Sequence, residues 1–291
     1  MWRIWLAALF WGLNWPAVKV LLGGASPWTL RAAGLTGGTL LLVVATFASR
    51  RSFAVPRADW WKLVVAGLLN VAAFNIFAVF AQMSMTASRA AIITYTMPLW
   101  SVLFARFALA EPIDGFRAAA MTLGAGGIVL LAKPFWGTIA SGGVPIGLVY
   151  VLLAAVTWAA GTVFVKWSAP RGDPLSLTTW QFAVGAVATV IGMCLLETPR
   201  LDLSDPVRQA AFAFHVIFPQ AVAYALWFAL MARVPASTAA LGTLLVPVVA
   251  VTASSLWIGE RLSPLDWLGF AMILGALALD QGLARRWRPG R

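Results

Sequence analysis

The chain has 291 residues, of which 61% are hydrophobic and 11% are charged, with a net charge of +11 and a mean hydropathy of +0.86. Soluble domains carry about 45–50% apolar and about 25% charged residues, so this composition excludes an ordinary soluble fold. The basic residues are expected to orient the chain in a lipid bilayer, and no nucleic acid is expected as a partner.

Apolar stretches of spanning length recur along the whole chain. A helix that crosses the bilayer needs roughly 20 apolar residues. The stretches predict an all-α polytopic membrane protein with ten transmembrane helices, and the sustained alternation typical of a membrane β-barrel is not seen. In chain order they cover residues 3–22, 27–48, 60–82, 86–109, 115–132, 144–167, 174–196, 208–232, 236–258 and 264–283.

Lys and Arg are divided unequally between the two sides of this predicted topology. Fourteen lie on the side that holds both termini, six lie on the opposite side, and Arg31 lies inside the second helix. By the positive-inside rule the richer side is cytoplasmic, so we expect both the N- and the C-terminus in the cytoplasm. The single cysteine, Cys194, excludes an intramolecular disulfide and a CxxC motif.

The two halves of the chain resemble each other. At a shift of 147 residues, Trp11 aligns with Trp158 and Lys19 aligns with Lys166. Because five helices is an odd number, the sequence predicts two inverted five-helix repeats, residues 1–140 and 141–291, around a central cavity. Secondary transporters often have this plan. At a shift of 149 residues the aligned pairs include Ser88 with Ser237, Thr94 with Thr243, Pro98 with Pro247 and Glu111 with Glu260.

These repeats resemble the EamA domains of the drug/metabolite transporter superfamily. The similarity lies in segments 6–15 and 153–159, and in the fourth-helix pattern of small residues, proline and glutamate that recurs in the ninth. It covers essentially the whole chain and implies a ten-helix basket in the bacterial inner membrane. By overall likeness, the chain is most similar to exporters of amino acids and related metabolites, including the YddG-type exporters of aromatic amino acids.

The sequence and the resemblance together predict a secondary transporter that exports small metabolites, aromatic or neutral amino acids first, by alternating access. No Asp or Glu falls in the middle of a predicted span, so we expect downhill transport without tight proton coupling. The alternatives are a passive channel or pore and, as substrates, other metabolites or nucleotide-sugar-like solutes. Walker, HExxH and GxSxG motifs are absent, so we expect no enzyme activity, metal or cofactor.

Two prolines are candidates for gating hinges. Pro98 and Pro247 fall about midway along their predicted helices, and each frees the carbonyl four residues earlier, on Thr94 or Thr243. A threonine at that place can bond back to its own helix and deepen a bend. The alternative is that proline is simply common in membrane helices.

Polar and aromatic residues inside the predicted spans are candidates for binding substrate, because unpaired polar groups are costly in lipid. The alternatives are packing for the tryptophans, snorkelling to the interface for the lysines, and hydrogen bonding between helices for the amides. His215 is expected to be structural, and Glu111 and Glu260 to organise the turns that follow them. The candidates are Trp11, Asn14, Lys19, Asn75, Tyr95, Trp158, Lys166, Gln220 and Tyr224.

Overall fold

The computed structural model describes residues 2–226 and 245–286. All regular elements in these ranges are helical, apart from one isolated antiparallel bridge between Ala25 and Leu201. Six of the described helices are long and apolar enough to cross a membrane, or seven if the bent pair Gly115–Leu131 and Lys133–Ala140 forms one span. The predicted all-α membrane fold is therefore confirmed in its class.

The first half of the chain follows the predicted spans, with two of them divided. The span predicted at 60–82 is interrupted by a π-helical segment, and the span predicted at 86–109 is broken at Tyr95 and Thr96. Its elements are α1 (Trp2–Leu21), α2 (Pro27–Ala48), η1 (Arg57–Asp59), α3 (Trp60–Ala66), η2 (Gly67–Ala73), α4 (Phe74–Ser84), α5 (Ala87–Thr94), α6 (Met97–Ala108) and α7 (Gly115–Leu131).

The first half ends with a short bent segment, η3 (Lys133–Phe135) and α8 (Trp136–Ala140). The second half resumes long helices and contains a second π-helical segment, η4, directly after α11. Its described elements are α9 (Ile146–Ser168), α10 (Pro174–Leu196), α11 (Pro206–Ile217), η4 (Phe218–Val222), α14 (Leu245–Ile258) and α15 (Pro264–Arg286).

Proline and aspartate explain where several helices begin. In α10, Pro174 occupies the first turn and Asp173 accepts hydrogen bonds from the amides of Leu175 and Ser176 at 3.0 and 3.4 Å. Proline suits this position because the first amides of a helix have no partner inside it, and aspartate supplies one. A capping box begins α15, since Ser263 and Asp266 exchange hydrogen bonds of 2.8–3.2 Å.

The helix break next to Pro98 differs in detail from the expectation. Pro98 is the second residue of α6, and the hydroxyl of Thr96 donates to the carbonyl of Ile93 at 2.7 Å. The hydroxyl of Thr94, expected to bond back, is buried and has no partner in the described part of the chain. Pro247 is the third residue of α14, and Thr243 lies outside the described residues.

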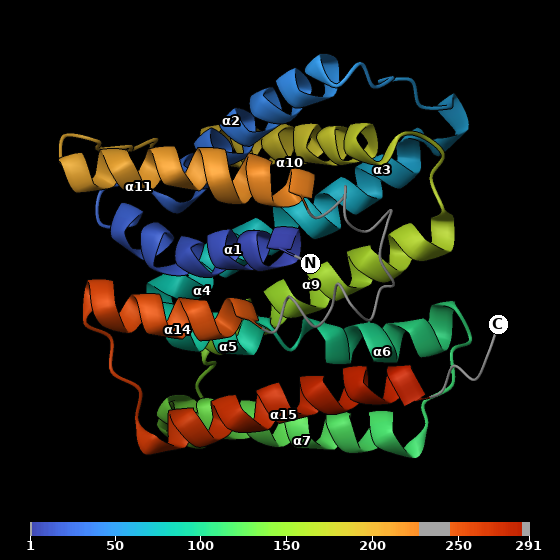
Figure 1. Ribbon diagram of the computed structural model, residues 1–291. Helices are drawn as coiled ribbons and strands as arrows, with labels where there is room; N and C mark the ends of the chain where they lie inside the picture. The colour runs from blue at the N-terminus through green and yellow to red at the C-terminus, as the bar shows by residue number, and fades with distance from the viewer. Residues whose placement is uncertain (1, 227–244, 287–291) are drawn as a thin grey trace.

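The helices run in similar directions and pack side by side (Figure 1). The main pairs are α7 with α15, α2 with α10, α1 with α14, and α9 with both α4 and α6. In this view α1 begins near the centre of the molecule, and α15 ends farther to the right. Small residues allow the closest approach, because a Cβ atom on Gly127 of α7 would lie 2.9 Å from the carbonyl oxygen of Gly269 in α15.

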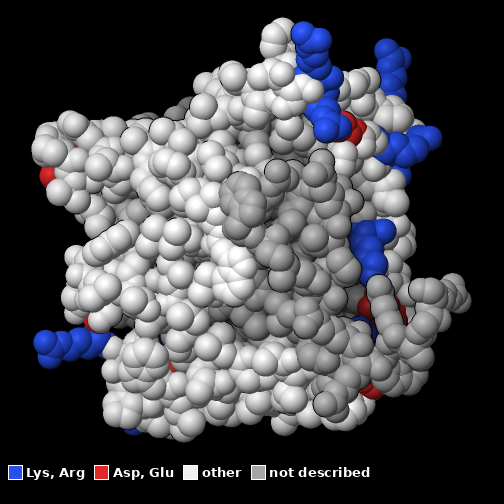
Figure 2. Space-filling model, viewed as in Figure 1, with Lys and Arg blue, Asp and Glu red and all other residues white. Residues whose placement is uncertain are grey.

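The surface is consistent with a lipid environment. Figure 2 shows that the charged side chains of this face gather toward the ends of the helices and leave a broad uncharged area between them. Large apolar side chains are exposed along α2 and α10, where a bilayer would cover them. Examples are Leu40, Val44, Val187 and Leu195.

Candidate functional site

An aromatic cluster lies where α1, α9, α10 and the segment after η4 meet. The ring of Tyr224 lies 5.4 Å from the ring of Trp11, 6.3 Å from that of Trp158 and 4.6 Å from that of Phe182. Phe74 at the start of α4 lies 4.7 Å from Trp158. Three of the predicted candidates therefore meet, together with two phenylalanines that resemble ordinary core residues in the sequence.

A buried arginine accompanies the aromatic cluster. Arg31 is only 3% exposed, and its Nη1 atom donates to Oδ1 of Asn75 at 3.2 Å. Leu35, one turn after Arg31 on α2, packs in the same core cluster as Tyr224 and Phe182. The side chain therefore turns toward the protein interior and does not extend to the interface. The interior of the protein thus contains a cation.

His215 makes a second buried polar contact next to α2. Its Nδ1 atom lies 2.7 Å from Oδ1 of Asn14, a predicted candidate on α1. Its Nε2 atom is buried without a partner among the described residues and faces α2, where a Cβ on Gly34 would lie 2.5 Å away. The glycine at position 34 thus allows the ring to lie directly against α2, one turn from Arg31.

Two π-helical segments flank the cluster at related positions. Shifted by 149 residues, η2 overlaps η4, and Asn75 aligns with Tyr224. Gln220 lies within η4, and Trp11 donates from Nε1 to the carbonyl of Pro219 at 3.3 Å. π-helical segments often occur at functional sites because they change the direction of the side chains that follow. A single sequence carries no clear signal for them.

Tyr95 also belongs to this region. It is buried at the end of α5, beside the break that precedes α6, in a core cluster against which Trp11 and Trp158 also pack. The described cluster therefore brings together Trp11, Asn14, Asn75, Tyr95, Trp158, Gln220 and Tyr224 around Arg31 and His215.

The two candidate lysines lie elsewhere. Lys19 donates from Nζ to the carbonyls of Gln82 and Met85, and the second contact measures 3.0 Å. It therefore binds the C-terminal end of α4. Lys166 forms an exposed ion pair with Glu111. Neither side chain contacts the aromatic cluster in this conformation, so their role in binding substrate stays a prediction.

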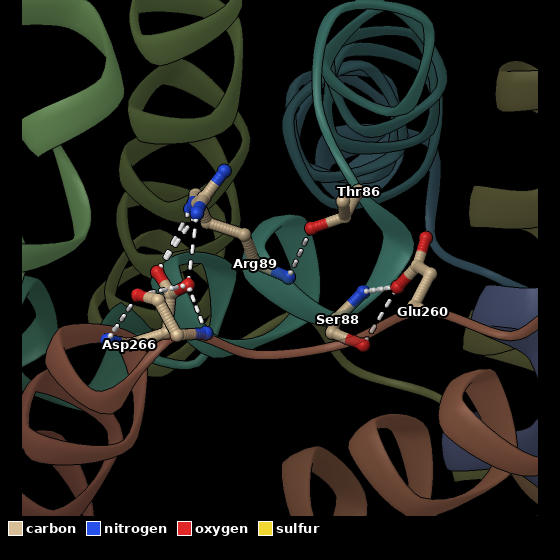
Figure 3. Close-up of polar contacts among 6 residues, drawn as sticks. Thr86, Ser88, Arg89, Glu260 and Asp266 are labelled. Carbon is tan, nitrogen blue, oxygen red and sulfur yellow. Dashed lines mark hydrogen bonds and ion pairs between the residues drawn. The ribbon is translucent and has the colours of Figure 1, made fainter.

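The junction between α4 and α5 is stabilised from the other half of the chain (Figure 3). Glu260 accepts hydrogen bonds from the amides of Ala87 and Ser88 at 2.7 and 2.9 Å and from the Ser88 hydroxyl at 2.7 Å. Arg89 pairs with Asp266 at 2.8 Å. The expectation that Glu260 organises the turn into α15 is wrong, because its carboxylate caps α5 instead.

A second glutamate acts in the same way at the start of α2. Glu197, which follows α10, accepts from the amides of Trp28 and Thr29 at 3.2 and 2.5 Å and from the Thr29 hydroxyl at 2.8 Å. A carboxylate is favourable at a helix N-terminus because it meets unpaired amides and the positive end of the helix dipole. Among the described residues, no group of three or more His, Cys, Asp or Glu side chains could hold a metal ion.

Apolar helices of spanning length, packed around a buried cluster of aromatic and polar side chains from both halves, are typical of a multi-pass membrane transporter. Comparison with known families agrees. The EamA-like transporter family matches residues 2–133 and 145–279, and the chain belongs to this family.

Similar proteins are found in bacteria. An uncharacterized transporter of Bacillus subtilis, YvbV, is 28% identical over 93% of this chain and 88% of its own length. Protein PecM of Dickeya dadantii is 30% identical over 79% of this chain and 77% of its own. A probable amino-acid metabolite efflux pump of Escherichia coli is 25% identical over 97% of this chain and 94% of its own.

A solved crystal structure shares the fold. It covers 99% of this chain and 98% of its own length, with a TM-score of 0.70 and 22% sequence identity.

Proposed function

We propose that this protein exports small metabolites, with aromatic or neutral amino acids as the first substrate class, by alternating access. The observation that carries the proposal is the buried cluster around Tyr224, in which aromatic rings and amide groups from both halves of the chain meet. Aromatic faces suit an apolar substrate side chain, and the polar groups suit its charged ends. The Escherichia coli relative described as a probable amino-acid metabolite efflux pump supports the same class.

Ten transmembrane helices in two inverted repeats, residues 1–140 and 141–291, are part of this proposal. The packing supports it, because the main pairs have counterparts. The contact of α1 with α14 corresponds to that of α9 with α6, and the contact of α1 with α11 corresponds to that of α9 with α4. The pairs α2 with α10 and α7 with α15 each join two equivalent helices of the two repeats. A two-fold axis in the membrane plane would produce this pattern. We place the protein in the bacterial inner membrane with both termini in the cytoplasm.

The hinges proposed for alternating access are Thr94, Pro98, Thr243 and Pro247. The break between α5 and α6 supports the first pair, since Tyr95 at this break packs in the same core cluster as Trp11 and Trp158. Irregular backbone beside a binding site is a common element of secondary transporters.

The test is counterflow in liposomes that contain the purified protein, using a labelled panel of amino acids and related metabolites. A secondary transporter accelerates exchange of selected substrates without electrical conductance, whereas a channel gives conductance in a planar bilayer. Liposomes with equal substrate concentrations inside and outside and an imposed pH gradient then test whether transport is coupled to protons. Downhill transport predicts no net accumulation, and accumulation that a protonophore abolishes would contradict it.

A further inference from the structure

Arg31 lacks a negatively charged partner inside the protein. All ten Asp and Glu side chains lie within the described residues, and none forms an ion pair with Arg31. They instead pair with other basic side chains or cap helix N-termini, and they are Asp59, Glu111, Asp114, Asp173, Glu197, Asp202, Asp205, Glu260, Asp266 and Asp280.

A buried cation with only a neutral amide as partner is costly. Charged side chains inside membrane proteins are rare, and a buried charge without a counter-charge destabilises the fold. The Nε atom of Arg31 is buried and has no partner in the described part of the chain, although Nη1 binds Asn75. The side chain therefore retains a free donor edge, to which a planar carboxylate can bind through two N–H groups.

We infer that Arg31 binds the carboxylate of the transported substrate, which is an aromatic or large apolar amino acid. This inference rests on the proposed function. Leu35, one turn after Arg31 on α2, packs in the same core cluster as Tyr224 and Phe182. Asn75, the partner of Arg31, directly follows Phe74, whose ring lies 4.7 Å from that of Trp158. A carboxylate at Arg31 therefore places the substrate side chain among aromatic rings.

The amino group of the substrate meets a weaker partner. None of the ten carboxylates reaches this cluster, so only neutral acceptors face an ammonium group. His215 offers no further acceptor, because its Nδ1 atom lies 2.7 Å from Oδ1 of Asn14 and its buried Nε2 atom lies against Gly34 of α2. Recognition therefore depends on the carboxylate, and the amino group is dispensable.

Analogues of one substrate test, without any mutation, whether the carboxylate matters more for binding than the amino group. Labelled phenylalanine counterflow is measured in liposomes with four competitors: phenylalanine, 3-phenylpropionate, phenylalaninamide and phenethylamine. The first two keep the carboxylate and are expected to compete with similar strength. The last two lack it and are expected to compete at least about tenfold more weakly, which is the loss of one charged hydrogen-bonded contact.

Variants assign this selectivity to Arg31. Arg31→Gln is expected to remove the preference for acids over amides, and Arg31→Lys to keep part of it. Arg106→Gln changes an exposed arginine at the end of α6 and should retain the wild-type preference. Because the Arg31 charge has no counter-charge, the unfolding temperature of Arg31→Gln should stay at or above that of the wild type, whereas a purely structural arginine would lower it.

Asn75→Asp offers a sharper test, because it places a carboxylate next to the Nη1 atom of Arg31, where Oδ1 of Asn75 now lies at 3.2 Å. This internal carboxylate should raise the unfolding temperature and weaken competition by 3-phenylpropionate at least about tenfold. Asn75→Ala is the matched control and should not raise the unfolding temperature.

Binding is measured separately, as the shift in unfolding temperature that 3-phenylpropionate or phenethylamine causes in the purified protein. Stabilisation by the acid without counterflow would support the carboxylate site and overturn the transport proposal. Counterflow in which acids and amides compete equally, or in which Arg31→Gln keeps the preference, would overturn the inference and leave the transport proposal standing. If neither counterflow nor stabilisation by the acid is observed, both the inference and the transport proposal are overturned.

Discussion

Two pairs of residues at aligned positions in the two halves make different contacts. Lys19 and Glu260 lie at the α4–α5 junction, where the lysine binds carbonyls that end α4 and the glutamate binds amides that begin α5. Lys166 and Glu111, shifted from them by 147 and 149 residues, pair directly with each other, and their side chains are 65% and 32% exposed. The same residue types therefore stabilise helix ends in one place and form exposed ion pairs in the second, where Glu111 also lies 3.8 Å from Arg117.

The difference separates two kinds of electrostatic contact. A charge that binds several unpaired backbone groups at a partly buried helix end is effective, because water competes poorly there and the helix dipole adds to the attraction. An exposed lysine–glutamate pair is screened by water and contributes about 0–1 kcal/mol. In this conformation the junction of Lys19 and Glu260 is thus the more firmly bonded of the two regions.

The largest expected difference between the regions concerns the glutamates. Glu260→Ala should lower the free energy of unfolding by about 2–3 kcal/mol, because it removes a charged acceptor of three hydrogen bonds and leaves the first amides of α5 unpaired. Glu111→Ala should cost less than about 1 kcal/mol. Thermal unfolding of the purified variants measures both, and equal losses would show that the two glutamates are equivalent in stability.

The lysines should differ in the same direction and less strongly. Lys19→Met leaves the carbonyls of Gln82 and Met85 without their cationic donor, which we expect to cost about 1–2 kcal/mol. Lys166→Met should change stability by less than about 1 kcal/mol. The comparison fails if Lys166→Met is the more damaging of the two in the same unfolding assay.

The helix break between α5 and α6 should affect the rate of transport more than the stability of the protein. Pro98→Ala and Pro247→Ala are expected to slow counterflow while changing the free energy of unfolding by less than about 1 kcal/mol, because alanine permits a straighter helix without removing a native contact. Folded yield is the control. Transport at the wild-type rate in both variants would remove the case for hinges.

The smallest effect concerns the loop after α10, on the same side as Lys19. Hydrogen bonds from Ser204, together with Arg208, lower the pKa of Asp202 to about 2. The lowered pKa means that this contact stabilises the protein above the ordinary aspartate pKa of about 4 and loses its effect as the pH falls from about 4 to 2. Unfolding temperatures measured over a range of pH should show that Asp202→Asn loses only the decrease in stability between about pH 4 and 2 that this contact causes. If the variant and the wild type have identical pH profiles, the assignment is wrong.

Much of the helical fold could be predicted from the sequence because its boundaries are local. The spans predicted at 27–48 and 174–196 coincide with α2 and α10, which begin with proline in the first turn. The interruption by η2 could not be predicted, because its residues are ordinary for a helix and the change in hydrogen bonding depends on packing against α9 and α10.

Part of the candidate cluster could also be predicted from the sequence. Trp11, Trp158 and Tyr224 could be selected because aromatic and polar residues are noticeable in apolar spans, and the structure brings them together. Arg31 could not be chosen, since its position near a helix end is equally compatible with snorkelling outward. The direction of its side chain depends on Asn75, which lies on another helix.

The glutamate caps also impose an order on biosynthesis. The amide of Ala87 leaves the ribosome 173 residues before its partner Glu260, and that of Thr29 leaves 168 residues before Glu197. At synthesis rates of about 5–20 residues per second, α5 waits roughly 9–35 s for its cap. The first half of the chain therefore enters the membrane with two unfinished helix ends, which Glu197 after α10 and Glu260 after α14 complete later.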